Sequence, residues 1–193
     1  MAIMEIARLE VKSTTTFSFP DVYTALHDFM YENGFCNDAD AGFPEKFYSE
    51  SRTQTKGKEI WVWWRFKKPY SGTGGSSFVN VLIDIDFHGI GIRDLEIMYN
   101  DKKIGVNKGK IEIVIRGRFE IDPNDKLKKS FIGSFMDSFI NKYWRKELLD
   151  YRQDVVNDLN KIRNYAAQLL DKQTTDFLAK PFHPTLGYKR EDF

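Results

Sequence analysis

The sequence lacks most of the features from which a function is usually inferred. A single cysteine, Cys36, excludes an internal disulfide and provides no thiol spacing for a metal site. The three histidines are scattered, so no Ser–His–Asp or Cys–His grouping can be derived from them. We therefore expect a protein that is not an enzyme and that carries no cofactor or metal.

Long apolar runs are also missing. No stretch approaches the roughly 20 apolar residues that cross a bilayer, and the first residues lack the basic start and apolar core of a secretion signal. The 29 basic and 28 acidic residues leave a net charge of +1. This balance argues against a general nucleic-acid or membrane-surface binder, which needs a basic excess. We expect no membrane insertion, and a location in the cytoplasm or in a particle assembled there.

Apolar and aromatic residues, in contrast, are plentiful enough for a folded core, at 41% and 15% of the chain. Residues 20–33 are predicted to form a helix. Pro20 suits a first helical turn, where its missing N–H would be unpaired in any case, and Asn33-Gly34 provides a left-handed stop. The apolar residues of this helix share one face: Val22, Leu26, Phe29 and Met30.

Between this helix and residue 121 the pattern changes to the alternation of apolar and polar residues that is typical of half-buried strands. Gly89 and Gly91 are predicted to bend or bulge the chain, and turns are predicted at 100–103 and 107–110. Together with the N-terminal segment, the predicted strands are 3–19 (one strand or two), 46–55, 59–67, 78–88, 95–99 and 111–121.

The C-terminal third is predicted to be helical, because no Gly or Pro interrupts it from Ser134 to Lys180. A continuous helix over 127–171 would be roughly 65 Å long. A break near Lys146-Glu147 would instead give an antiparallel pair. The predicted units are a sheet domain (1–121), a long helix or helical pair (122–171) and an irregular interaction tail (172–193).

This order of elements predicts the α+β class. Strands connected in hairpin succession form an antiparallel sheet, here of about five to six strands, and helices pack on one face of it. The sheet would carry the N-terminal helix and the long C-terminal helix or helix pair.

Beyond Trp144 the apolar stripe of the long helix narrows to the kind of row that suits a partner helix in a coiled coil. We therefore expect this part of the helix to project and bind a partner, either a second copy or another protein subunit. The predicted partner-binding residues are Leu148, Arg152, Val155, Leu159, Ile162, Ala166 and Leu169 in the helix and Phe182, Tyr188 and Phe193 in the tail.

Two functions follow as hypotheses. The first is a non-enzymatic structural or assembly subunit of a larger complex, such as a virion or similar particle, with contacts through the C-terminal helix and tail. The alternative is a small-molecule or lipid-binding α+β domain with an apolar cavity between sheet and helix. A helix held along its whole length by its own sheet favours the alternative, and a projecting helix favours the first.

Two clusters on the predicted strands could carry chemistry. Asp84, Asp86 and His88 share one strand face and could ligate a divalent metal, although any half-exposed strand produces the same pattern. Trp61 and Trp63 share a face with Arg65 and Lys67, which could form a stacking platform for bases or sugars, or a protein-contact patch. For the metal cluster we favour a solvated strand face, and for the tryptophans we favour coverage by the long helix.

Overall fold

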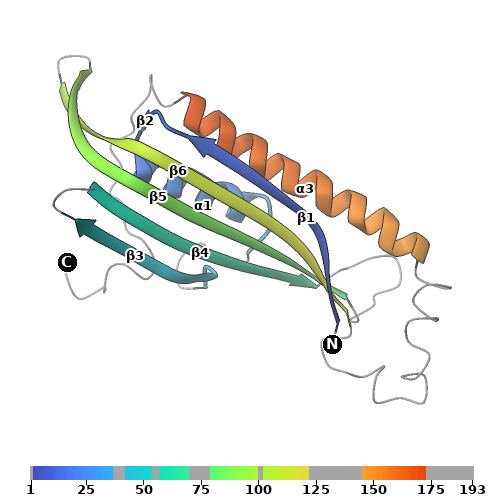
Figure 1. Ribbon diagram of the computed structural model, residues 1–193. Coiled ribbons are helices and arrows are strands. Elements are labelled where there is room, and N and C mark those ends of the chain that lie inside the picture. Colours follow the sequence, from blue (N-terminus) through green and yellow to red (C-terminus); the bar gives the residue numbers. More distant parts are fainter. Residues whose placement is uncertain are drawn as a thin grey trace.

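The computed structural model describes residues 2–36, 42–53, 57–69, 79–99, 102–121 and 145–172. Its strands form one antiparallel six-stranded sheet in the order β1-β6-β5-β4-β3, with the short β2 also paired to β6 (Figure 1). The α+β class is therefore confirmed. The elements are β1 (Ala2–Ser13), β2 (Thr16–Phe17), α1 (Phe19–Glu32), β3 (Glu45–Thr53), β4 (Gly57–Pro69), β5 (Val79–Tyr99), β6 (Lys102–Ile121) and α3 (Arg145–Lys172).

The first helix forms where the sequence predicts it. Ser18 caps α1, because its Oγ accepts a hydrogen bond from the Asp21 N–H at 3.4 Å. At the other end the Asn33 N–H donates to the Phe29 carbonyl at 3.1 Å, and Gly34 follows with φ 69°. Glycine adopts this left-handed conformation without a steric penalty, so it ends the helix.

The strands β5 and β6 are longer than predicted. The expected strands 78–88 and 95–99 belong to one strand, whose register shifts between Ile90 and Arg93. The expected turn at 107–110 does not occur, because these residues continue β6 and pair with β5. β2 also pairs with β6 there, so ladder bonds on both sides of β6 outweigh a weak local turn preference.

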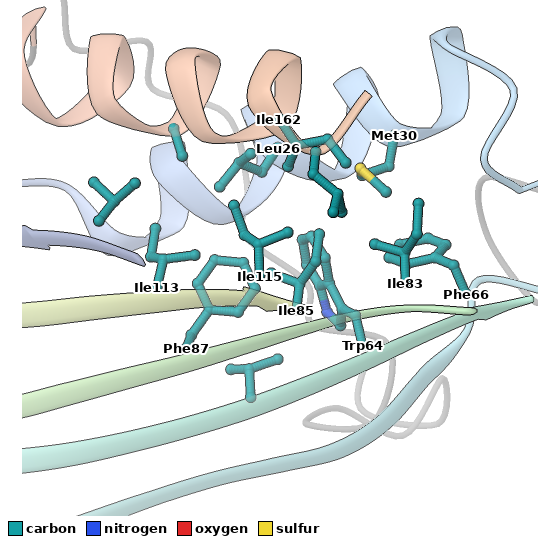
Figure 2. Packing of buried hydrophobic residues seen from close by; sticks show 14 of the residues in the cluster. Leu26, Met30, Trp64, Phe66, Ile83, Ile85, Phe87, Ile113, Ile115 and Ile162 are labelled. Atoms are coloured by element: carbon teal, nitrogen blue, oxygen red, sulfur yellow. The ribbon is translucent and has the colours of Figure 1, made fainter. Parts of the chain in front are cut away.

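Both helices cover the same face of the sheet (Figure 1). Alternate residues of β4, β5 and β6 point toward them, including Trp64, Phe87 and Ile115, which are fully buried. Figure 2 shows Leu26 and Met30 of α1 and Ile162 of α3 directed at these strand residues. The helices also contact each other, since the rings of Phe29 and Tyr165 stack with centroids 4.3 Å apart.

Placement of α3 corrects the expectation of a projecting arm. The side chains of Val155, Leu159, Ile162 and Ala166 belong to the chain's own hydrophobic core and are 6%, 0%, 0% and 0% exposed. The narrow row was interpreted as a seam for a second helix, but the sheet and α1 cover it. The row packs against β1, β6 and α1.

The remaining predictions for the C-terminal region concern residues that the structure does not describe. Segments 122–144 and 173–193 lie outside the described residues, and with them lie Phe182, Tyr188 and Phe193. Whether 127–171 is one helix or a pair therefore stays a prediction.

Close approach of α3 to the sheet depends on a glycine of β6. A Cβ added to Gly117 would lie 2.6 Å from Leu159 Cδ1 and 3.4 Å from Leu159 Cγ, and Leu159 is itself fully buried. The partner of Gly117 on β1 is Ala7, next to a register shift in that strand. Small residues on two neighbouring strands thus make the notch into which the helix fits.

We expect Gly117→Ala to lower the free energy of unfolding by about 1–3 kcal/mol, because the added methyl group displaces Leu159 in a packed core. Urea denaturation of both proteins would measure the loss. Gly105→Ala is the matched control: no atom lies within 4 Å of a Cβ at Gly105, so this variant should stay within about 0.5 kcal/mol of wild type. Equal stability of the two variants would contradict a close contact between Gly117 and Leu159.

Candidate functional site

The sheet face turned away from the helices carries a network of charged side chains. Asp84 lies opposite both Arg65 and Arg116 in the strand register. Arg118 donates to Asp84, Arg116 donates to Asp86, and Arg65 Nη1 lies 2.6 Å from Asp86 Oδ1. Charges of opposite sign on neighbouring strands stabilise a sheet through such direct and diagonal contacts.

Within this network the carboxylates are more deeply buried than the guanidinium group of Arg65. The side chains of Asp84 and Asp86 are 8% and 16% exposed, whereas that of Arg65 is 30% exposed. Burial lowers the pKa of Arg65, and the nearby Asp84 carboxylate opposes this change. At the end of the network, hydrogen bonds from Lys67 and Asn80 lower the pKa of Glu120.

These contacts bear on the metal hypothesis. Asp84 and Asp86 are engaged by arginines, while His88 Nε2 lies 2.9 Å from Glu59 Oε1 and the His88 ring stacks on Trp61 at 3.5 Å. Across the described ranges, no group of three or more His, Cys, Asp or Glu side chains is arranged to hold a metal ion. The three residues therefore act as members of a cross-strand network.

The part of the long helix that the structure describes, α3, does not cover Trp61 and Trp63 as predicted, because α1 and α3 both lie on the opposite face of the sheet (Figure 1). Trp63 is 38% exposed and packs against Phe47, with ring centroids 4.5 Å apart. The Arg65 guanidinium lies 5.7 Å from the centre of the Trp63 ring. Because Arg65 is already paired with Asp86 and lies near Asp84, its charge is largely offset and is not free to contact a nucleic-acid phosphate.

A cavity lies between the sheet and α3. It has a volume of about 180 Å³, and its walls come from β4, β5, α3 and the segment after α1. The lining residues are Phe35, Phe66, Lys68, Pro69, Val81, Ile83, Tyr151, Asp154, Val155 and Asp158.

Strand register and helical spacing explain why these residues meet. Phe66 is paired with Ile83, and the next inward-facing residue, Lys68, is paired with Val81. On α3 the lining positions 151, 154, 155 and 158 are spaced by three and four residues, which places them on one side of the helix. The cavity therefore has an apolar interior, with charged side chains from both the strand and the helix.

Sequence reasoning found little of this site. Among the predicted partner-binding residues whose side chains the structure describes, only Val155 lines the cavity, while Arg152 is exposed and Leu169 is partly buried. The side chain of Leu148 lies outside the described part of the chain. One available signal was the inward row of β4, which is apolar through Phe66 and then changes to a charged residue.

Comparison of the chain with known protein families found no matching family model, and comparison with characterised proteins found no match. Within the described ranges, neither helix combines the length and the hydropathy that a membrane-spanning segment needs.

We expect Asp84→Asn to lower the free energy of unfolding by about 1–3 kcal/mol, because Arg65 and Arg118 would lose a shielded anionic partner. Thermal and urea denaturation would measure the change. Glu96→Gln is the control, since Glu96 and Lys103 form an ion pair at 3.6 Å in which both side chains are mostly exposed. That variant should lose about 0.5 kcal/mol or less. Similar losses in both variants would contradict a stabilising role for the network.

Proposed function

We propose that this protein is a small-molecule-binding α+β domain whose ligand occupies the cavity between the sheet and α3. The observation that carries the proposal is the cavity itself, about 180 Å³ in volume, at the junction of the two layers. The cavity is partly open to solvent and lies beside the docked helix α3. A pocket with a mostly apolar lining and a few polar groups has the composition of a ligand site.

The dimensions of the cavity define the ligand class. An apolar cavity of about 150 Å³ holds a benzene molecule, so this one suits a single ring or a short branched chain. A long lipid chain exceeds this volume and would extend out of the cavity. We therefore narrow the ligand to a small molecule with an apolar body and a polar group at the cavity mouth.

A titration with toluene, followed by saturation-transfer NMR, tests the proposal. Wild-type protein should bind toluene, and Val81→Phe should reduce the affinity at least about tenfold, because the larger ring would fill the space beside Phe66 and Ile83. Val114→Phe makes the same change on the opposite face of the sheet, next to Asp86, and should leave binding unchanged.

Two results would contradict the proposal. One is the absence of toluene binding to the folded wild type. The other is equal binding by Val81→Phe and Val114→Phe, which would place the bound toluene elsewhere.

Exposed apolar residues favour a second candidate function, that of an assembly subunit. Pairing of β5 with β4 ends at Ile92 and pairing of β6 with β2 ends at Asn107, so beyond Asp94 β5 and β6 continue as a two-stranded ribbon (Figure 1). Leu95 and Met98, on opposite faces of this ribbon, are 40% and 65% exposed. Two-stranded ribbons are marginally stable in water, and exposed apolar groups mark interaction sites. The partner we propose is a second copy of this chain.

We expect the wild-type protein to form a dimer or larger oligomer, and the double variant Leu95→Glu, Met98→Glu to be monomeric, because like charges would meet at the interface. Light scattering after size-exclusion chromatography measures both masses. Lys103→Glu, on the same ribbon, is the control for a change of charge alone. A monomeric wild type at high concentration would contradict self-association.

A further inference from the structure

We infer that the ligand is a zwitterion, namely an α-amino acid with an apolar side chain no larger than one ring. This inference rests on the proposed binding function and assigns the ligand's charged groups. It follows from the charges on the two walls of the cavity mouth, which have opposite signs.

The strand wall is positive. Lys68 continues the inward-facing row of β4 after Phe66, at the point where the apolar floor of the cavity ends. Its neighbour on β5, Val81, is apolar. The Lys68 side chain is exposed, as expected for an ammonium group at a mouth rather than in an interior.

The helix wall is negative. Asp154 and Asp158 lie four residues apart, on either side of the buried Val155. Carboxylates at this spacing repel each other. Lys161 offsets part of this charge: its Nζ lies 2.9 Å from Asp158 Oδ1, and the Asp154 carboxylate also helps to raise the pKa of Lys161. Two negative charges and one positive charge leave this wall with a net charge of −1, so a bound cation would be stabilised there.

The charges on the two walls are not paired at ion-pair distance. Among the described residues, no ion pair joins Lys68 to Asp154 or to Asp158. A group that carries an ammonium and a carboxylate on one carbon atom would offer each wall a charge of the opposite sign. Its ammonium would face the aspartates, its carboxylate would face Lys68, and its side chain would enter the cavity between Phe66 and Val155.

The same charges disfavour ligands with a single charge. An amine would be attracted to Asp154 but repelled by Lys68, and a carboxylic acid would experience the reverse. Each interaction lies near solvent, so each should change affinity by about fivefold or less.

NMR titrations with four compounds that share a phenyl ring test the inference: toluene, 3-phenylpropionate, 2-phenylethylamine and L-phenylalanine. L-Phenylalanine should bind wild-type protein about fivefold more tightly than either singly charged compound. Chemical-shift changes should be centred on the cavity residues and should be lost in Val81→Phe.

Two charge variants give a crossed pattern. Lys68→Met should weaken binding of L-phenylalanine and 3-phenylpropionate but not of 2-phenylethylamine. Asp154→Asn should weaken binding of L-phenylalanine and 2-phenylethylamine but not of 3-phenylpropionate. Asp150→Asn, an exposed residue of the same helix that does not line the cavity, is the control and should change none of the affinities.

The outcomes separate the two proposals. If any phenyl compound binds in the cavity but L-phenylalanine has no advantage, or if the crossed pattern is absent, the zwitterion inference is wrong and the binding function stands. If none of the four compounds binds there, the proposed function fails as well.

Discussion

The fold depends on how closely α3 can approach the sheet. That distance is set where Leu159 meets Gly117, because a side chain on β6 at this point would hold the helix away. With the helix docked, its apolar row closes the core above β1 and β6 and meets α1 through the Phe29–Tyr165 stack. One helical turn before Leu159, Val155 lines the cavity. The docking contact therefore also positions one wall of the candidate site.

One-sided coverage by the helices gives the sheet two different faces. The covered face is apolar, and the open face carries Asp84, Asp86 and their arginine partners. On the open face, aromatic rings such as Trp63 pack beside charged groups, so exposure there does not by itself indicate a binding platform. Because the cations are engaged by carboxylates, this face fits a stabilising role better than recognition of nucleic acid.

The sequence predicted those features that depend on local pattern. Helix α1, the antiparallel pairing and the irregularity near Gly91 all follow from spacing, capping and alternation. Prediction from the sequence failed where contacts between distant residues decide the structure. The turn predicted at 107–110 does not form, because these residues pair with β5 and β2. The apolar row that contains Val155 was assigned to a partner, although the protein's own sheet covers it. The width of an apolar row on a helix indicates how wide its contact is, but not which surface it contacts.

The candidate site could not be predicted for the same reason. Its walls come from Lys68 on β4 and Asp154 on α3, which are far apart in sequence and become neighbours of one cavity only after the helix docks. On a surface, charges of this kind are usually solvated and contribute little. At the mouth of an apolar cavity, however, they are the groups nearest to the polar end of anything inside it. In the proposed binding function, selectivity would therefore come from where the inward row of β4 ends, and the apolar interior would set only the size of the ligand.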